Sequence, residues 1–388
     1  MNRIPRTVWA LGAVSLFMDL SSEMVHGLLP LYLTGVLGAS MVVVGIVEGI
    51  AEATAAMVKV FSGSLSDRFA RRKPLLIVGY GLAALSKPLF PLATSVPMVL
   101  AARFMDRIGK GIRGAPRDAL MADVTPKAVR GTAYGLRQTL DTVGAVFGPL
   151  AAVGLMFLFA DDIHKVLWVA AVPALAAVAV LAAFVKEPAR ESTAGNKSIV
   201  ISRADLSTLG ARYWSIVAIG GLMTLARFSE AFLVLRAQEL GVALALVPLV
   251  LVLMNVVYTA VSYPAGVAAD NGHRRELFIW GVAALAAADI VIGASDSVAA
   301  LAIGIVLWGA HLGLTQGLLA TLVADAAPAT LRGTAFGVFH LICGVALLAA
   351  SVLAGWLWSN YGAGATFFAG GAFCILSLVG VLAVSDLD

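Results

Sequence analysis

The chain has 388 residues, of which 60% are hydrophobic and 13% are charged. Soluble proteins carry about 25% charged residues, so this composition excludes a soluble protein and indicates one that resides in a membrane. The net charge of +4 fits the basic loops of a membrane protein, and we do not interpret it as nucleic-acid binding.

Long apolar stretches, separated by short polar breaks, fill nearly the whole chain. A helix needs about 20 mostly apolar residues to cross the hydrocarbon core, and the stretches lack the roughly ten-residue alternation of a barrel wall. We therefore predict an all-α membrane protein with twelve transmembrane helices. The predicted spans are 7–36, 40–66, 73–93, 97–120, 130–159, 163–185, 211–237, 242–269, 274–294, 297–325, 331–358 and 362–385.

Lys and Arg gather in the even-numbered connections between these spans. Cytoplasmic loops retain positive charge, so both termini are predicted to be cytoplasmic. The first apolar stretch contains Asp19, Glu23 and His26 and is too long for a cleavable signal peptide, so we expect it to remain as the first helix. Cys343 and Cys374 have neither disulfide nor metal-site spacing, and we expect no metal and no cofactor.

The sequence repeats itself at a shift of about 202 residues. Residues 122–135 match 324–337 at Ala-Asp, at Pro and at Arg-Gly-Thr-Ala. A second match, in the connection after the second span of each half, relates Gly63, Asp67, Arg71 and Arg72 to Gly266, Asp270, Arg274 and Arg275. We therefore predict two related six-helix bundles, 1–185 and 211–388, joined by a polar cytoplasmic linker at 186–210.

Three motifs resemble signatures of the major facilitator superfamily, and the resemblance covers essentially the whole chain. Residues 63–72, Gly-Ser-Leu-Ser-Asp-Arg-Phe-Ala-Arg-Arg, resemble its loop between helices two and three. Residues 103–109 resemble its fourth-helix signature, although Asp106 and Arg107 replace a neutral residue and a glycine. Residues 144–149, which include Gly144, Gly148 and Pro149, resemble a fifth-helix motif common among exporters.

The resemblance implies a monomeric carrier in a bacterial inner membrane that works by alternating access. It implies proton transfer at a fourth-helix arginine and cavity-lining first, fourth, seventh and tenth helices. Residues 106–118 resemble a bacterial subgroup whose members are mostly named only as transporters, which indicates no substrate. Gating is expected at the loop signatures, the flanking second helix and the fifth-helix motif, with candidates Gly63, Asp67, Arg68, Arg71, Arg72, Glu48, Glu52, Gly144, Gly148, Pro149, Asp270 and Arg274.

Ionisable side chains inside the predicted spans are the candidates for coupling and solute binding. Each costs roughly 2.5 to 3.5 kcal/mol on insertion scales, so it is retained where it pairs or lines a cavity. Either buried ion pairs or proton coupling would account for those of the first half, and the spacing leaves both open. The candidates are Asp19, Glu23 and His26 on the first helix, Arg103, Asp106, Arg107, Lys110 and Arg113 on the fourth, and Arg137 and Asp141 on the fifth, with Arg227, Glu230 and His311 in the second half.

We predict a proton-coupled carrier of a small organic solute, with export favoured over import. Guanidinium groups recognise carboxylates and phosphates, so an anionic or zwitterionic solute is expected. The alternatives are a multidrug or cation:proton antiporter, and a proton-coupled importer of siderophores or organic anions. A channel filter, a nucleophile with its base and a metal cluster are all missing from the sequence, so neither a channel nor an enzyme is expected.

Overall fold

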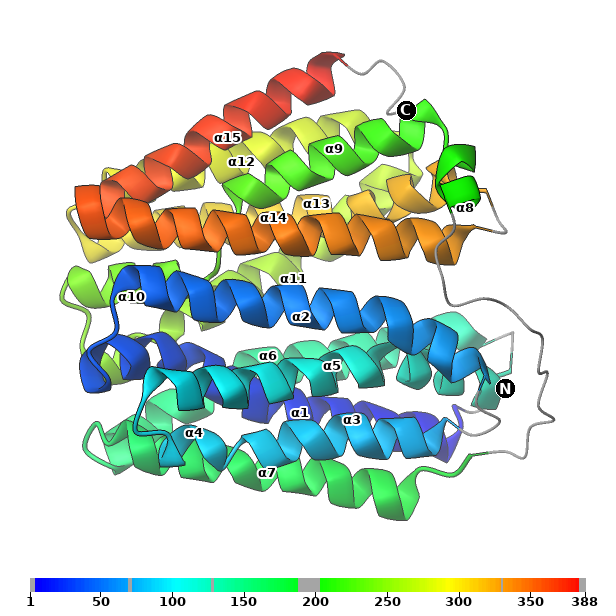
Figure 1. The fold of residues 1–388 in the computed structure, drawn as a ribbon, viewed down its shortest axis with the longest axis horizontal. Helices are drawn as coiled ribbons and strands as arrows, with labels where there is room; N and C mark the ends of the chain where they lie inside the picture. The colour runs from blue at the N-terminus through cyan, green and yellow to red at the C-terminus, as the bar shows by residue number, and fades with distance from the viewer. Residues whose placement is uncertain (1–3, 69–71, 127–128, 188–202, 329–330, 384–388) are drawn as a thin grey trace. The chain divides into compact units, whose positions relative to one another are not determined.

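A computed structural model describes residues 4–68, 72–126, 129–187, 203–328 and 331–383. Every regular element in these ranges is helical, which confirms the all-α prediction (Figure 1). Besides a π-helical turn, η1 (Tyr32–Val36), and a 3₁₀ turn, η3 (Leu244–Leu246), the helices are α1 (Arg6–Leu31), α2 (Met41–Arg68), α3 (Lys73–Ser86), α4 (Leu89–Leu92), α5 (Val96–Val124), α6 (Arg130–Leu158), α7 (Ile163–Phe184), α8 (Arg203–Thr208), α9 (Ala211–Ala226), α10 (Ala231–Glu239), α11 (Leu249–Asp270), α12 (Arg274–Gly293), α13 (Val298–Ala326), α14 (Arg332–Tyr361) and α15 (Ala363–Ala383).

Ten stretches of the described residues are long and apolar enough to cross a membrane. Two of the twelve predicted spans are not among them. The predicted span 97–120 is α5, a helix of 29 residues that carries too many charges to qualify by composition. The predicted span 362–385 is α15, where only the shorter stretch Ala363–Val379 qualifies as apolar. The helices are therefore present, and the twelve-span count stays a prediction.

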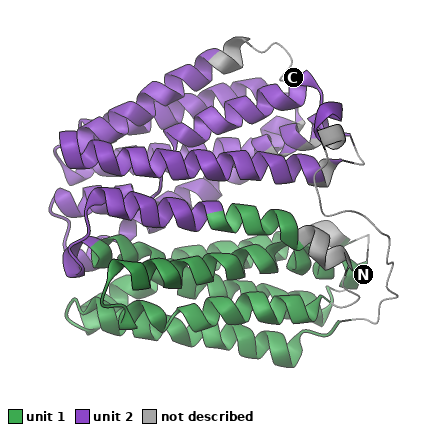
Figure 2. Ribbon diagram, in the orientation of Figure 1, with its two compact units in different colours: residues 1–33, 54–199 green, residues 34–53, 200–388 purple. Residues whose placement is uncertain are grey.

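The chain divides into two compact units (Figure 2). Unit 1 contains Met1–Leu33 and Thr54–Ile199, and unit 2 contains Thr34–Ala53 and Val200–Asp388. The division falls in the predicted linker 186–210, most of which lies outside the described residues, but it also assigns the first half of α2 to unit 2. The reason is close packing on α14: a Cβ on Gly49 would lie 2.9 Å from the Cα of Leu348.

Within each unit the helices pack in the same pattern. In unit 1, α1 packs against α6 and α7, and α3 packs against α5 and α7. In unit 2, α9 packs against α14 and α15, and α12 packs against α13 and α15. These pairs correspond in chain order, so the repeat in the sequence is also a repeat of helix packing.

The repeat extends to helix starts and to an ion pair. α5 begins after Ser95 and α13 after Ser297, both in extended conformation. Arg72 Nη1 lies 2.7 Å from Asp123 Oδ2, and Arg274 Nη1 lies 2.8 Å from Asp325 Oδ2. By its ion pair, Arg72 of unit 1 therefore corresponds to Arg274 of unit 2. The motif spacing in the sequence matched Arg72 to the next residue, Arg275.

Two predicted spans are interrupted. The span predicted at 73–93 breaks into α3 and α4 at Lys87 and Pro88, because proline has no N–H to continue the helical hydrogen bonds. The span predicted at 211–237 breaks into α9 and α10. There the Ser229 N–H donates to Ser351 Oγ at 3.2 Å, and Ser229 Oγ accepts from the Ala231 N–H at 3.3 Å. These bonds to side-chain oxygens replace continuous helical bonding.

We predict that Arg72→Gln lowers the free energy of unfolding more than Arg274→Gln does. The Arg72 side chain is 5% exposed, whereas that of Arg274 is 27% exposed. Water therefore screens the pair of Arg72 with Asp123, which is 34% exposed, less than the pair of Arg274 with Asp325, which is 43% exposed, and pairs that water screens contribute up to about 1 kcal/mol. Thermal unfolding of both variants in detergent, with Asp123→Asn and Asp325→Asn to complete two double-mutant cycles, measures the difference. Equal coupling energies in the two cycles would contradict the prediction.

Candidate functional site

The charged residues of α5 lie mostly inside unit 1 rather than on its surface. Arg103 is 1% exposed, Asp106 2%, Arg107 4% and Arg113 5%. Lys110 is the exception, since its side chain is exposed. The spacing of three and four residues therefore places a line of buried charges along one helix, and each must find a partner there.

Asp106 forms a buried ion pair that the sequence did not reveal. Lys87 Nζ lies 2.9 Å from Asp106 Oδ1 and donates to Ser22 Oγ at 3.0 Å. Arg107 Nε lies 3.5 Å from the other carboxylate oxygen of Asp106. Lys87 is 1% exposed and directly precedes the helix-breaking Pro88. Of the two interpretations left open for Asp106, this geometry favours a structural ion pair.

Arg103 contacts the predicted histidine of α1. Its Nη2 lies 2.9 Å from His26 Nδ1. Because a guanidinium can only donate, Nδ1 must accept, and a proton on the neutral ring is then carried by Nε2. His26 therefore serves here as a hydrogen-bond acceptor for a buried arginine.

The middle of α5 is held by residues that the motifs did not single out. The Arg113 guanidinium lies 4.8 Å from the centre of the Tyr80 ring, a cation–π contact. Arg117 Nη1 donates to Ser15 Oγ at 2.9 Å. The Ser15 and Tyr80 hydroxyls are 3.4 Å apart and join these two contacts.

Two arginines share two aspartates where α5 meets α6. Arg137 is paired with Asp141, and its Nε lies 3.8 Å from Asp118 Oδ1. Arg117 Nε lies 3.1 Å from Asp118 Oδ1, and its Nη1 lies 4.0 Å from Asp141 Oδ2. From the spacing, Arg137 and Asp141 could pair with each other or with charges on the fourth predicted helix. Both kinds of pair are present.

The acids of α1 lie against glycines of α6. A Cβ on Gly144 would be 3.0 Å from the Asp19 Cβ, and one on Gly148 would be 2.7 Å from the Glu23 Cβ. Pro149 follows within the same helix. The glycines thus allow α1 to approach α6 closely. This contact brings Asp19 within electrostatic range of Arg117 and Asp141.

The predicted gating residues of α2 are only partly described. Glu48 is 1% exposed and Glu52 is half-buried, both in the half of α2 that belongs to unit 2. The candidates without a described side chain are Gly63, Asp67 and Arg68 on α2 and Asp270 on α11, while Arg71 lies outside the described residues.

In unit 2 the candidates lie near the break between α9 and α10. Arg227 and Glu230 are the first and last residues of this break. His311 of α13 is fully buried, with Nδ1 2.8 Å from the Gly281 carbonyl oxygen. Arg227 lies within electrostatic range of His311. Sequence analysis missed Asp289 of α12, which is also fully buried.

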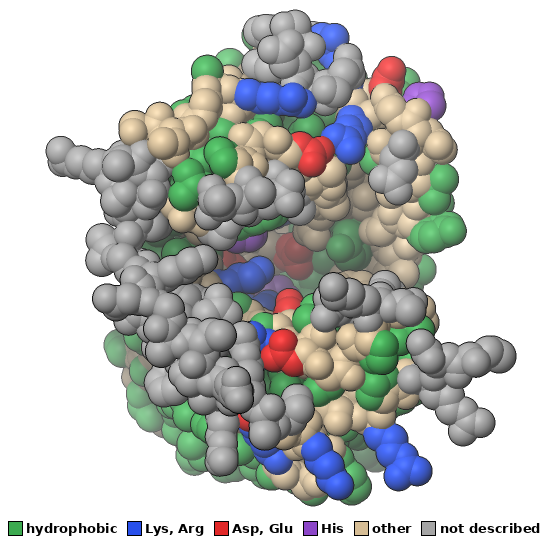
Figure 3. Space-filling view, turned by 90° about the vertical axis from the view of Figure 1, so that its right-hand side faces the viewer, with side chains coloured by type: hydrophobic (Ala, Val, Ile, Leu, Met, Phe, Trp, Pro, Cys, Tyr) green, Lys and Arg blue, Asp and Glu red, His purple; other side chains and the backbone are tan. Residues whose placement is uncertain are grey.

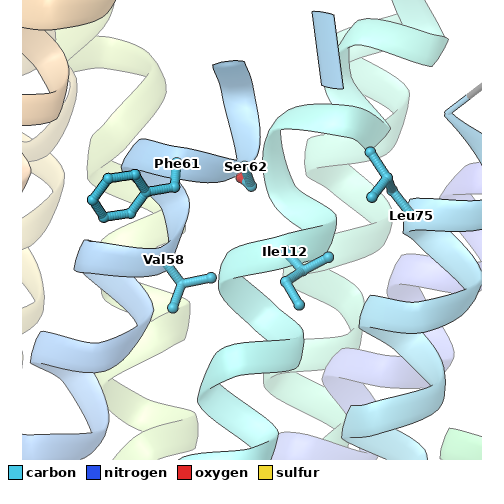
Figure 4. A pocket seen from close by; sticks show the side chains of 5 residues that line it. All are labelled: Val58, Phe61, Ser62, Leu75 and Ile112. Atoms are coloured by element: carbon cyan, nitrogen blue, oxygen red, sulfur yellow. The ribbon is translucent and has the colours of Figure 1, made fainter. Parts of the chain in front are cut away.

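A small pocket in unit 1 has no polar chemistry of its own. It lies among α2, α3 and α5, and its lining is Val58, Phe61, Ser62, Leu75 and Ile112 (Figure 4). The Ser62 hydroxyl is bonded to the Lys59 carbonyl at 3.1 Å. The pocket is therefore separate in character from the charged residues of α5.

We call the charged side chains gathered around α5 the unit 1 charge cluster. The cluster includes Lys59 and Lys110, which are exposed, and Lys59 lies within electrostatic range of Asp118, Lys110, Arg117 and Arg137. Lys and Arg side chains are visible on the face where α1 begins and α2 ends (Figure 3). The cluster consists of eight cations, Lys59, Lys87, Arg103, Arg107, Lys110, Arg113, Arg117 and Arg137, and five acids, Asp19, Glu23, Asp106, Asp118 and Asp141.

A bundle of long apolar helices with paired charges inside is the architecture of a polytopic membrane protein. The sequence model of the Major Facilitator Superfamily matches residues 11–233 and 216–386. The chain belongs to the major facilitator superfamily. It is 30% identical over 382 residues to an uncharacterized MFS-type transporter of Methanocaldococcus jannaschii, covering 97% of this chain and 94% of that protein.

Two further relatives have names that indicate transport. The inner membrane transport protein YajR of Escherichia coli is 25% identical over 381 residues, covering 94% of this chain and 80% of YajR. The multidrug resistance protein MdtH of Proteus mirabilis is 33% identical over 135 residues, covering 35% of this chain and 33% of MdtH.

Solved structures share the fold at low identity. Nucleoside transporter NupG gives a TM-score of 0.79 at 11% identity, covering 97% of this chain and 98% of NupG. The human organic anion transporter MFSD10 gives a TM-score of 0.69 at 16% identity, covering 98% of this chain and all of MFSD10.

We predict that Gly148→Ala destabilises the protein by about 1 to 3 kcal/mol. The new methyl group would lie 2.7 Å from the Glu23 Cβ and 2.8 Å from the Leu20 carbonyl oxygen, so α1 must move away from α6. The matched control is Gly154→Ala on the same helix, where nothing lies within 4 Å. The control should be neutral or gain up to about 1 kcal/mol of helix propensity. Thermal unfolding in detergent measures both, and equal stabilities would contradict the prediction.

We predict that Asp106→Asn lowers stability by about 3 to 5 kcal/mol, because it leaves buried Lys87 and Arg107 without their carboxylate. Replacing the pair by apolar residues, Lys87→Met with Asp106→Leu, should recover much of this loss. Lys165→Gln, at a side chain that is 61% exposed, should have no measurable effect. Denaturant titration gives the three values. An Asp106→Asn variant as stable as wild type would contradict the structural role of the pair.

Proposed function

We propose that the protein is a secondary active transporter that moves a small organic solute across a bacterial inner membrane by alternating access. In this proposal transport is proton-coupled, the monomer is the working unit, and the solute is anionic or zwitterionic and is exported. Membership of the superfamily supports the transporter class. The features of unit 1 support the finer statements.

The excess of cations in the unit 1 charge cluster supports an anionic or zwitterionic solute. Six of the eight cations already contact acids, hydroxyls, His26 or an aromatic ring, as described above. Lys59 and Lys110 keep exposed side chains and lie within electrostatic range of one another, and the acid in range of Lys59 is Asp118. A carboxylate or phosphate of a solute would offset this positive charge, because charge-assisted bonds to anions are stronger than bonds between neutral groups.

The acids of α1 support proton coupling. Asp19 shares its surroundings with Asp141 and Arg117. The electrostatic surroundings of Asp19 depend on the balance between a like charge and an opposite charge, so small movements of these helices would alter them. Because Gly144 and Gly148 hold α1 on α6, a shift between the two helices would change that balance.

A multidrug antiporter is the second candidate. Its support is the similarity to multidrug resistance protein MdtH of Proteus mirabilis over 135 residues, together with Asp19 and Glu23, which could attract cationic solutes. The two candidates differ in solute charge and in the residues on which they depend.

We predict that purified protein in proteoliposomes moves protons when an anionic or zwitterionic solute is added. A pH-sensitive dye inside the vesicles reports the movement, and panels of anionic, zwitterionic and cationic solutes are compared. Glu23→Gln and Asp19→Asn should abolish uphill transport and leave solute exchange. Uphill transport that survives in both variants would overturn proton coupling by these acids.

Variants of the exposed lysines test the solute class within the same assay. Lys110→Gln should raise the concentration of anionic solute needed for half-saturation roughly ten- to a hundredfold, since loss of one charge-assisted bond costs about 1.5 to 3 kcal/mol. The matched control is Lys165→Gln, an exposed lysine at the start of α7, which should leave transport unchanged. Transport confined to cations and unaffected by Lys110→Gln would favour the multidrug candidate.

A further inference from the structure

Asp289 lies on α12 in unit 2, far along the chain from the unit 1 charge cluster. Its side chain is fully buried. Among the described residues it forms no ion pair, and its Oδ1 has no hydrogen-bond partner. Its Oδ2 accepts a hydrogen bond from the thiol of Cys374 on α15, at 4.0 Å. A thiol is a weak donor, so this bond compensates a buried carboxylate for little of the water it has lost.

The end of α9 presents an unsatisfied carbonyl to the same place. Ala226 is the last residue of α9, and the break at 227–230 removes the helical N–H that would otherwise bond to its carbonyl oxygen. In the described part of the chain this buried carbonyl accepts no hydrogen bond. It is therefore a second polar group without a partner.

Gly370 of α15 shows that the two groups lie close to one another. A Cβ built on Gly370 would lie 2.6 Å from Asp289 Oδ2 and 3.0 Å from the Ala226 carbonyl oxygen. The two oxygens are therefore at most 5.6 Å apart, the sum of these distances. Two acceptors facing across a glycine have no stabilising contact. A proton on one oxygen of Asp289 converts the carboxylate into a donor aimed at a carbonyl.

The charged groups on neighbouring elements do not offer another solution. Arg227, just after α9, interacts with His311 and Cys343, and Glu230 lies at the far end of the break. His311 of α13 is bonded to the Gly281 carbonyl, two turns along α12 from Asp289. A metal cation would need about six oxygen ligands, whereas the groups that face this point are one carboxylate, one carbonyl and one thiol.

We propose that Asp289 is a proton-binding site in unit 2. Its protonated carboxyl donates to the carbonyl oxygen of Ala226 at the break between α9 and α10. The bound proton thereby joins α12 to the end of α9, and its loss leaves two acceptors in opposition at this point. The proposal concerns proton binding alone and does not rest on the coupling proposed for Asp19 and Glu23.

Infrared spectroscopy of the purified protein in lipid nanodiscs tests the proposal without a solute or transport. The wild type should show a carbonyl stretching band of a protonated carboxylic acid at neutral pH, and Asp289→Asn should lose one carboxyl group's share of this band. The matched control is Asp296→Asn, at an exposed aspartate just beyond the end of α12, which should leave the band intact. A band of equal size in wild type and Asp289→Asn would overturn the proposal.

A second measurement applies even if Asp289→Asn does not fold. Wild-type protein carrying carbon-13 in its aspartate carboxyl groups should show an isotope-shifted acid band at neutral pH. Gly370→Ala, which places a methyl group 2.6 Å from Asp289 Oδ2 and 3.0 Å from the Ala226 carbonyl oxygen, should change the position of that band, because both oxygens must move and the bond to Ala226 is disturbed. Absence of the isotope-shifted band, or a band unmoved by Gly370→Ala, would likewise overturn the proposal.

Discussion

The ion pair between Lys87 and Asp106 illustrates the constraint on which unit 1 depends: a charge inside an apolar helix bundle must have a partner at the right height on an adjacent helix. Insertion of an unpaired charge costs several kcal/mol. α5 carries a line of such charges, and the surrounding helices supply a partner for most of them. α1 provides Ser15 and His26, and α6 provides Asp141. The packing of α1, α3 and α6 around α5 is therefore also a pairing of charges.

The position of Lys87 shows how backbone and electrostatics combine. Pro88 interrupts the third predicted span, and the residue before it points its ammonium group at Asp106 and Ser22. On the opposite flank, the glycines of α6 allow α1 to approach closely enough for Asp19 to interact with Arg117 and Asp141. A proline and two glycines, none of them charged, thus determine which ionisable groups meet. The site is built by backbone geometry as much as by charge.

The two units share a packing pattern but differ in their interior chemistry. The same arginine–aspartate pair is found in both, between Arg72 and Asp123 and between Arg274 and Asp325. Unit 1 encloses a network in which cations exceed acids. Unit 2 buries Glu48, Asp289 and His311, and it buries Arg236 in an ion pair with Glu239. The duplicated packing pattern therefore encloses different electrostatic environments in the two units. In unit 2, the break between α9 and α10 lies close to Asp289.

Hydropathy, basic-residue placement and the repeat at a shift of 202 residues were sufficient to predict an all-helical membrane protein with a twofold plan. These properties are local or periodic along the chain, so they can be recognised without knowing which helices pack together. The same holds for the face shared by Asp19 and Glu23 and for the pairing of Arg137 with Asp141, because both follow from helical spacing.

Only the tertiary structure decided which residues are partners. Lys87, between α3 and α4, and Asp106 of α5 are 19 residues apart, and Arg117 and Ser15 are 102 apart. The break at 227–230 depends on a hydroxyl of Ser351, which is 122 residues away from Ser229. Asp289 escaped notice because it is a single acid in an apolar run, without spacing to another charge. Its isolation, and the carbonyl that faces it, become visible only when α9, α12 and α15 are brought together, because a missing partner is a property of the packed neighbours and not of the chain.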